Sequence, residues 1–508
     1  MRQLSEHDAA FLFSDSAHAN SNVTLLHIYD QSTAPGGRVR FKDILAHIEG
    51  RLHLSPIFRQ KLKRLPFDFD FPYWVEDENF DLEFHVRHIA LPKPGDWRQF
   101  CIQVSRIHAR PLDLNRPLWE IYVIEGLDTF VDLPPGSFAL VTKIHHAALD
   151  VEEGSEITSL LHDTTPTPHP PEPPEPWFPE TPPGEISMMA RGLIGSVWPP
   201  SRLVRPGLSL MRTLAPMVTT FVNDVLNKPS RIALTRFNAP VSPYRAFETR
   251  RFPLAEFKRI RDLVPGARIN DAVLAVCGGA LRHFLDLQGE LPEASLWSMA
   301  PIYMRDAEAE PGTRREMAWI RVQLGTHIAD PVERLRLIHE QTESELMERA
   351  VAASELTDSQ HHASAATLAF TSKFLTRAAM EVDKRAPRAN CTITNVPGPG
   401  KPLYLNGARM TYFSAIMPIT DGLGLVFAVT SYDGKIIISP TFCREQMPEP
   451  EVFAQAIRDS FQEYLALTEP VRAKRVAPRK PTAPAAAGTK PRPATPRRRK
   501  AAVGADQV

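Results

Sequence analysis

The sequence contains little cysteine, and what it has follows no pattern for a metal site or a disulfide framework. Four cysteines in 508 residues are far apart in the chain and form no CxxC pair. This excludes zinc-binding modules and small disulfide-rich secreted domains. We interpret all four as free thiols and expect a reducing, cytoplasmic compartment. They are Cys101, Cys277, Cys391 and Cys443.

Long hydrophobic runs are also absent. No segment approaches the ~20 apolar residues that cross a bilayer, and the opening MRQLSEHDAAFLF has no basic start followed by a sustained apolar core. We therefore predict neither a membrane span nor a signal peptide, and any membrane contact should be peripheral. Neither GxGxxG nor a P-loop occurs, which argues against dinucleotide and nucleoside-triphosphate chemistry.

Net charge is zero, with 59 basic and 59 acidic residues, but the two signs are unevenly placed. Residues 471–508 hold eleven Lys or Arg and one acid, so the body carries about −10 and the tail +10. Such a tail cannot bury a core and is expected to be disordered. It is either a solvated tail without a specific role or a contact for an anionic membrane, a lipid inclusion or another polyanion. No nucleic-acid partner is expected, because no folded basic domain precedes the tail.

Proline is abundant and clustered, and the cluster divides the chain. Residues 164–183 read TTPTPHPPEPPEPWFPETPP, a composition that forbids helix and central strand and is typical of an extended linker. Residues 187–226 follow, rich in Leu, Met and Arg; they are either connecting helices packed between domains or a membrane-interfacial element. The predicted parts are an N-terminal domain (1–163), the linker (164–186), connecting or interfacial helices (187–246), a C-terminal domain (247–470) and the tail (471–508).

Both halves mix strands and helices, which predicts an α/β (α+β) fold. Alternation through Phe80, Leu82, Phe84 and Val86 indicates a strand with one buried face, and Asn270 is expected to cap a helix. Further strands are expected at 23–29, 121–125, 138–144, 296–304, 319–324, 391–395, 410–416, 424–432 and 436–439, and helices at 41–52, 97–108, 254–263, 270–287, 331–350, 363–382 and 448–466.

A histidine pair ends the apolar run Phe138–Ile144. His145 and His146 follow it directly, and Asp150 comes four residues after His146. A buried imidazole must find hydrogen-bond partners, and a histidine pair taken alone is more often a satisfied, half-buried strand end or part of a metal site. Asp150 at this spacing, together with the segments described below, favours a function. A neutral imidazole can accept a proton near pH 7 and can serve as a general base. Because only Asp150 lies at ligand spacing, no metal is expected.

Several segments, taken in order, resemble the bacterial wax ester synthase/diacylglycerol acyltransferase family. The resemblance extends over about residues 1–468 and leaves out the proline linker and the tail. HHxxxD alone is moderately specific, whereas the ordered set is strong. The segments are LSEHDAAFL (4–12), FDLEFHVRHIALPKPG (80–95), RPLWEIYVIEGL (116–127), HHAALD (145–150), IND (269–271), TNVPGP (394–399) and MPITDGLGL (417–425).

The resemblance implies two chloramphenicol-acetyltransferase-like domains side by side with a central tunnel. The implied reaction moves an acyl group from acyl-CoA, a co-substrate, to a long-chain alcohol or diacylglycerol, with no permanently bound cofactor. His146 resembles the general base, and His145 is expected to orient the site. Asp150 is expected to be a strut paired with an arginine, for which Arg305 is the candidate.

Other motif residues leave two interpretations open. Asn270 and Asp271 match the family's ND motif and either lie near the reacting carbonyl or belong to a helix cap. Asn395 either donates to the oxyanion or forms a turn. The PLW residues are expected to build the tunnel floor rather than take part in the chemistry. They are Pro117, Leu118 and Trp119.

Two departures from the family pattern limit the resemblance. Val151 replaces the glycine of HHxxxDG, and a β-branched residue resists backbone conformations that glycine allows. The family's segment after the APIYMR strand is here RREMAW (314–319). Two alternatives remain: a condensation-type enzyme that uses carrier-protein thioesters, and an acyl-lipid-binding or inclusion-coating protein that has lost catalysis.

Overall fold

The computed structural model describes residues 2–64, 71–127, 129–130, 133–149, 157–168, 232–303, 317–355 and 387–469. Most of the proline linker, the segment 187–226, the helix expected at 363–382 and the basic tail lie outside these ranges. Within them, no helix is both long enough and apolar enough to cross a membrane.

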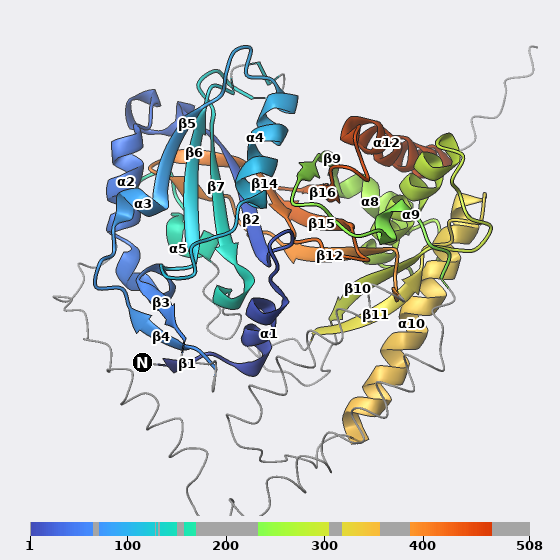
Figure 1. Cartoon of the computed structure of the whole chain (residues 1–508). Helices are drawn as coiled ribbons and strands as arrows, with labels where there is room; N and C mark the ends of the chain where they lie inside the picture. The colour runs from blue at the N-terminus through green and yellow to red at the C-terminus, as the bar shows by residue number, and fades with distance from the viewer. Residues whose placement is uncertain are drawn as a thin grey trace, which may run out of the picture. The chain divides into compact units, whose positions relative to one another are not determined.

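Six strands form the sheet that carries the histidine pair (Figure 1). Their order across the sheet is β13-β14-β2-β7-β6-β5, antiparallel except for the parallel pair β5 and β6. The strands are β2 (Asn22–Asp30), β5 (Val86–Ala90), β6 (Trp119–Glu125), β7 (Phe138–His145), β13 (Tyr404–Leu405) and β14 (Ala408–Ile416).

β7 is buried along its whole length because both faces of the sheet are covered. Leu140 and Ile144 point to one side, where they pack with α2 (Phe41–Glu49) and α5 (Ile157–Leu161). Ala139 and Val141 point to the other and pack against α4 (Trp97–Ala109). Alternate side chains of a strand face opposite sides, so the continuous apolar run Phe138–Ile144 is what a doubly covered strand requires.

β14 belongs to the C-terminal half of the sequence but pairs with β2 of the N-terminal half. The register runs from Arg409 beside Asp30 to Ile416 beside Thr24. A segment almost 400 residues further along the chain thus completes the first sheet. The predicted division of the chain near residue 247 remains a prediction, and any such division must allow for this exchange.

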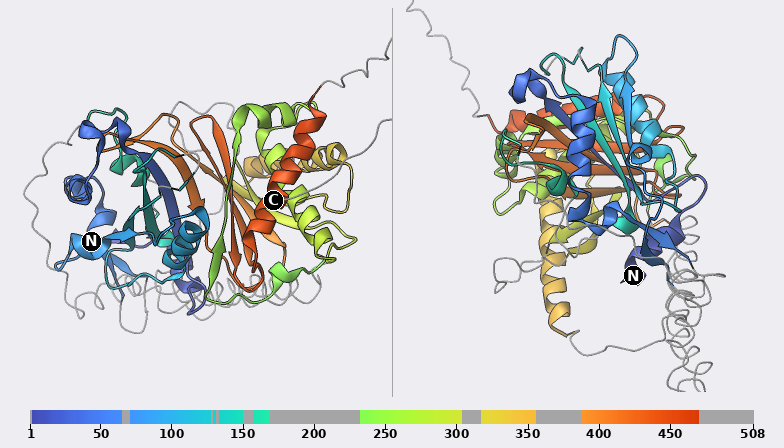
Figure 2. Two further views of the ribbon diagram at one scale, coloured as in Figure 1. Left: turned by 90° about the horizontal axis from the view of Figure 1, so that it is seen from above. Right: turned by 90° about the vertical axis from the view of Figure 1, so that its left-hand side faces the viewer.

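The second sheet has the order β11-β10-β12-β15-β16-β8, with β9 also pairing with β16. Helices α8, α9, α10 and α12 gather against it around one large apolar core (Figures 1 and 2). The strands are β8 (Arg245–Phe247), β9 (Arg250–Pro253), β10 (Trp297–Tyr303), β11 (Met317–Gln323), β12 (Cys391–Pro397), β15 (Leu425–Tyr432) and β16 (Lys435–Cys443). The helices are α8 (Leu254–Arg261), α9 (Ile269–Leu287), α10 (Pro331–Glu355) and α12 (Pro450–Leu467).

A small sheet, β1-β4-β3, lies near the start of the chain, followed along the sequence by short helices. The strand expected across Phe80–Val86 is wrong in its first part. Leu82–His85 form helix α3, which Asp81 caps by accepting the Glu83 N–H at 3.0 Å, and the strand begins only at Val86. The remaining elements are β1 (Arg2–Gln3), β3 (Gln60–Lys63), β4 (Tyr73–Glu76), α1 (Glu6–Ser14) and the 3₁₀ turns η1 (Gln31–Thr33), η2 (Pro35–Gly37), η3 (Leu52–Leu54), η4 (Pro56–Phe58), η6 (His146–Ala148) and η8 (Arg236–Asn238).

Candidate active site

The histidine pair lies where β7 ends and η6 begins. Two main-chain hydrogen bonds fix this junction: the His145 N–H donates to the Leu118 carbonyl at 3.0 Å, and the His146 N–H donates to the Ser21 carbonyl at 2.9 Å. The first bond ties the pair to the entry of β6, and the second ties it to the loop after α1. The two backbones that hold the pair therefore come from different parts of the N-terminal half.

His145 is a fully engaged imidazole, 1% exposed. Its Nε2 lies 2.9 Å from Asp15 Oδ2, and its Nδ1 accepts the Ala147 N–H at 3.1 Å. An acceptor at Nδ1 and a carboxylate at Nε2 assign the neutral tautomer protonated on Nε2. Both ring nitrogens thus have protein partners.

Asp15 joins the histidine to the loop that follows α1. It is the C-cap residue of that helix, and its second oxygen, Oδ1, accepts the Ser21 N–H at 2.7 Å. Asp15 therefore bonds to His145 and Ser21 at once, and Ser21 in turn bonds to His146. The sequence reasoning missed Asp15, which follows the quoted segment LSEHDAAFL by three residues and lies 130 residues before its partner.

His146 is half-buried and stacks on Phe11 of α1. The ring centroids are 3.7 Å apart and the planes differ by 16°. Stacking restricts the imidazole to one orientation without using a ring nitrogen. His145 is thus bonded through both ring nitrogens, and His146 stacks through its ring face.

Trp119 pairs with Ile144, the residue before the histidine pair, and is fully buried. Its Nε1 donates to the Phe58 carbonyl at 3.1 Å, and its own carbonyl lies 2.7 Å from His85 Nδ1. His85 stacks on the indole with centroids 4.5 Å apart, and burial lowers the pKa of His85. Leu118, equally buried, contributes its carbonyl to His145. These contacts support the expected role of Pro117–Trp119 as a floor, which remains a prediction.

A buried ion pair lies two residues before the histidines. Lys143 Nζ is 2.8 Å from Glu120 Oε2, and the lysine side chain is 0% exposed. Burial lowers the pKa of Lys143. Burial alone would raise the pKa of Glu120, but the ammonium of Lys143 lowers it overall. Lys143 also donates to the carbonyls of Ile107 and Arg110 at the end of α4, so it ties that helix end to the sheet. A lysine inside an apolar run was the only signal for this pair.

The ND motif lies at the start of α9, where the helix-cap assignment was wrong by two residues. The N-cap is Arg268, whose N–H donates to Asp271 Oδ2 at 2.8 Å. Asp271 is buried and also bonds His339 Nδ1 at 3.0 Å and Thr342 Oγ1 at 2.9 Å. Asp271 therefore holds α9 against α10. Asn270 lies within the first turn, and its proximity to a reacting carbonyl remains a prediction.

Asn395 lies in β12, paired with Val429 of β15, so the turn expected at this residue is wrong. The strand continues for two more residues and ends at Pro397. The role of Asn395 as an oxyanion donor remains a prediction.

Asp150, Val151 and Arg305 lie outside the described residues, so the expected pairing of Asp150 with Arg305 remains a prediction. Within the described part of the chain, no group of three or more His, Cys, Asp or Glu side chains could hold a metal ion.

The structure has two mixed sheets, and a strand from the C-terminal half of the chain, β14, completes the first of them. With a histidine pair at the end of the inner strand β7, this arrangement fits a two-lobed acyltransferase fold. Comparison with known families agrees. The wax ester synthase/diacylglycerol acyltransferase catalytic domain matches residues 4–273, and the C-terminal domain of the same family matches residues 316–464. The chain belongs to the wax ester synthase/diacylglycerol acyltransferase family and is an O-acyltransferase.

Relatives and solved structures support this assignment. A Mycobacterium tuberculosis protein, provisionally named a diacylglycerol O-acyltransferase, is 30% identical over 489 residues, covering 92% of this chain and 91% of the relative. The wax ester synthase/diacylglycerol acyltransferase from Marinobacter aquaeolei VT8 is 25% identical with a TM-score of 0.64, covering 92% of this chain and 100% of that one. A trichothecene 15-O-acetyltransferase from Fusarium sporotrichioides is 11% identical with a TM-score of 0.52, covering 92% and 94%, and shares the fold.

Proposed function

We propose that this protein transfers an acyl group from acyl-CoA to the hydroxyl of a long-chain alcohol or of diacylglycerol, with His146 as the general base. The observation that carries the assignment is the state of its neighbour. Both ring nitrogens of His145 are bound within the protein, to Asp15 and to the Ala147 N–H. Of the two imidazoles at the strand end, His146 is then the one suited to proton transfer.

The proposed reaction is a direct transfer. The His146 imidazole takes the proton of the acceptor hydroxyl as the oxygen attacks the thioester carbonyl, and a carbon–oxygen bond forms. The tetrahedral intermediate then breaks its carbon–sulfur bond. CoA leaves as a thiolate, which takes the proton from the imidazolium. Atoms and charges balance without an acyl-enzyme, and holding the two substrates together supplies much of the rate.

Neighbouring residues serve position rather than proton transfer in this proposal. His145 and Asp15 fix the backbone from which His146 extends. Ser21 connects them, because its N–H donates to the Asp15 carboxylate and its carbonyl accepts the His146 N–H. The stack on Phe11 sets the ring plane of His146. We propose Asp150 as the strut of the following loop, paired with Arg305, as the resemblance implies.

For the basic tail we propose peripheral contact with an anionic membrane or lipid inclusion. Eleven basic residues in 471–508 would each contribute about 1 kcal/mol near an anionic surface. Deleting 471–508 should weaken salt-sensitive binding to phosphatidylglycerol vesicles and leave turnover of soluble substrate unchanged. Unaltered vesicle binding would reject this role.

The central test is an assay of purified protein with palmitoyl-CoA and either hexadecanol or diacylglycerol. Release of CoA and formation of wax ester or triacylglycerol are both measured. We expect ester equal to CoA released and loss of both in His146→Ala. Ester formation that survives in His146→Ala would remove His146 from the mechanism. No ester with either acceptor would reject the proposed substrates.

A further inference from the structure

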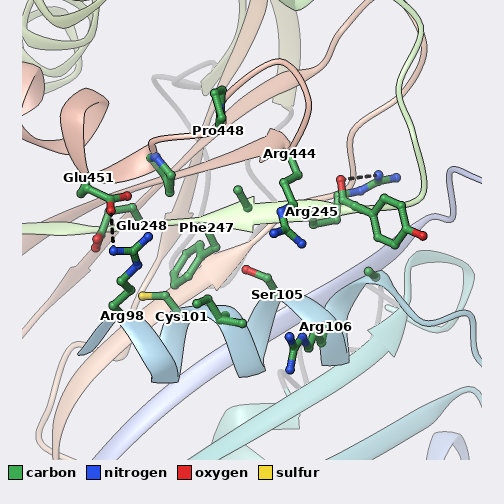
Figure 3. Close-up of a pocket in the computed structure, with 15 residues that line it drawn as sticks. Arg98, Cys101, Ser105, Arg106, Arg245, Phe247, Glu248, Arg444, Pro448 and Glu451 are labelled. Atoms are coloured by element: carbon green, nitrogen blue, oxygen red, sulfur yellow. Dashed lines mark hydrogen bonds and ion pairs between the residues drawn. The ribbon is translucent and has the colours of Figure 1, made fainter. Parts of the chain in front are cut away.

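A cavity of about 380 Å³ lies between α4, β8 and the segment that leads into α12 (Figure 3). It is distinct from the histidine pair, because neither His145 nor His146 lines it. Four arginines and two glutamates line it, so positive charge prevails. They are Arg98, Arg106, Arg245, Arg444, Glu248 and Glu451.

Part of this charge is satisfied within the protein. Arg98 pairs with Glu451 at 3.5 Å. Glu248 accepts the indole N–H of Trp97 at 2.6 Å. Arg245 is buried and directs its guanidinium at main-chain carbonyls. Both glutamates and two of the four arginines, Arg98 and Arg245, therefore already have partners within the protein.

The other two arginines, Arg106 and Arg444, are exposed. Neither guanidinium makes a hydrogen bond or a close ion pair with any residue in the described ranges. Arg444 extends from the wall opposite α4 toward the interior of the cavity (Figure 3). The cavity thus offers two guanidinium groups that no hydrogen bond or close ion pair engages within the described ranges, although Glu445 lies within electrostatic range of Arg444.

Ser105 gives an independent indication of a ligand. Its side chain is buried, 4% exposed, yet its Oγ has no hydrogen-bond partner among the residues described. A buried hydroxyl without a partner is unfavourable and requires an explanation. In Figure 3 the hydroxyl projects from α4 into the cavity, on the side that Arg444 faces. A ligand atom between the two would satisfy both groups.

We propose that this cavity binds a phosphoryl group between Arg444 and Ser105, with Arg106 adding positive charge at the rim. A guanidinium offers a planar fork of donors that fits phosphate oxygens, and a serine hydroxyl supplies a further donor. The rim is partly apolar: Ile102 is 43% and Tyr244 59% exposed. The phosphate is therefore expected to belong to a larger molecule with apolar or aromatic parts, such as CoA or a phospholipid headgroup.

The cavity and the histidine pair contact the same loop. Residue Ala109 lines the cavity, and its carbonyl accepts the Asn20 side chain at 3.2 Å. Arg245 donates to the His18 carbonyl at 2.8 Å. His18 and Asn20 lie between Asp15 and Ser21, the residues that hold the histidine pair. If the phosphate is that of CoA, this part of the inference rests on the proposed function.

The test uses the full-length protein and calorimetric titration with CoA, inorganic phosphate and pantetheine, which lacks phosphate. Phosphatidylglycerol vesicles are tested separately by flotation. Loss of a charge-assisted hydrogen bond corresponds to about tenfold or more in Kd, so we expect Arg444→Ala to weaken phosphoryl binding by at least that factor. Ser105→Ala should weaken it about threefold while leaving the Tm unchanged or higher. Arg458→Ala, an exposed arginine on α12, is the control and should bind as the wild type.

The results distinguish CoA from a phospholipid headgroup as the molecule that carries the phosphate. Weaker binding of CoA with unchanged vesicle flotation supports CoA as the carrier, and the reverse supports a lipid headgroup. Wild-type affinity of both Arg444→Ala and Ser105→Ala for all phosphorylated probes overturns the proposal, as does equal weakening for pantetheine. Since binding is measured without turnover, His146→Ala should bind CoA normally, which distinguishes failure of this site from failure of the proposed reaction.

Discussion

The carboxylate of Asp15 lies 2.9 Å from Nε2 of His145 and accepts a hydrogen bond from its N–H, while its other oxygen accepts the Ser21 N–H. One side chain thus bonds both to the strand end and to the loop that receives the His146 N–H. The pair HH is then two residues with separate tasks. His145 anchors the end of the strand, and this anchored backbone holds His146, the next residue, in place.

Replacing Asp15 should lower kcat more than it changes KM. Asp15→Ala leaves the buried Nε2–H of His145 without an acceptor, and a hydrogen bond to a charged group is worth about 1.5–3 kcal/mol. We expect kcat to fall about 10–100-fold, with a smaller loss in Asp15→Asn, whose amide oxygen can still accept. Steady-state kinetics with palmitoyl-CoA measure this. Asp262→Asn, an exposed carboxylate on the C-terminal half, is the matched control; an equal loss there would remove the special role of Asp15.

Replacing the two histidines should separate their tasks. His146→Ala removes the proposed base, and a positioned imidazole contributes about 10²–10⁴-fold, so kcat should fall by that factor. His145→Ala removes an anchor and should cost less, about as much as Asp15→Ala. The double variant Asp15→Ala/His145→Ala should lose less than the sum of the two single losses, because the two side chains share one hydrogen bond. Additive losses would show that Asp15 acts elsewhere.

Local patterns predicted much of this fold, and most of what they missed depends on contacts between residues far apart in the sequence. β7 and α9 were predicted within one residue at each end, because an apolar run or a helical period is written in consecutive residues. The Asp15–His145 bond and the pairing of β14 with β2 join residues far apart in sequence, and nothing local marks them. The errors at Phe80 and Asn270 have local causes. Asp81 caps a short helix where a strand was expected, and α9 begins earlier than expected because the Asp271 side chain accepts the N–H of Arg268, its N-cap residue.

Removing only Lys143 from its ion pair with Glu120 should destabilise the fold more than replacing both residues with uncharged ones. Lys143→Met leaves Glu120 without its ammonium partner, and breaking a buried pair costs about 3–5 kcal/mol. Adding Glu120→Gln removes the remaining charge and should restore part of that loss. Denaturant unfolding of the wild type, the single variant and the double variant measures the difference. A double variant less stable than Lys143→Met would show that Glu120 stabilises the fold without the lysine, through its bond from Tyr122.

Acid should destabilise this protein through histidines that the fold keeps neutral. Burial is the main cause of a lowered pKa in each: to about 3 for His108, where Arg245 and Lys143 add repulsion, and to about 4 for His162. The same direction holds for His27, His47 and His85.

The sign follows from where each imidazole binds its proton. Below about pH 6.5 an unfolded histidine is protonated, whereas folded His108 stays neutral until about pH 3. The unfolded chain therefore binds more protons in this window, and the free energy of unfolding falls as the pH falls, by about 1.4 kcal/mol per pH unit for each such histidine. His108→Asn should reduce this slope by about one proton between pH 6 and pH 4, measured by denaturant unfolding at each pH. His162→Asn should also reduce the slope between pH 6 and pH 4. Below about pH 4 it should leave the slope unchanged, because folded His162 is then protonated as well. An unchanged slope in both variants would mean that these imidazoles are protonated in the folded protein, contrary to their burial and to the contact of His108 Nδ1 with Thr24 Oγ1 at 2.9 Å.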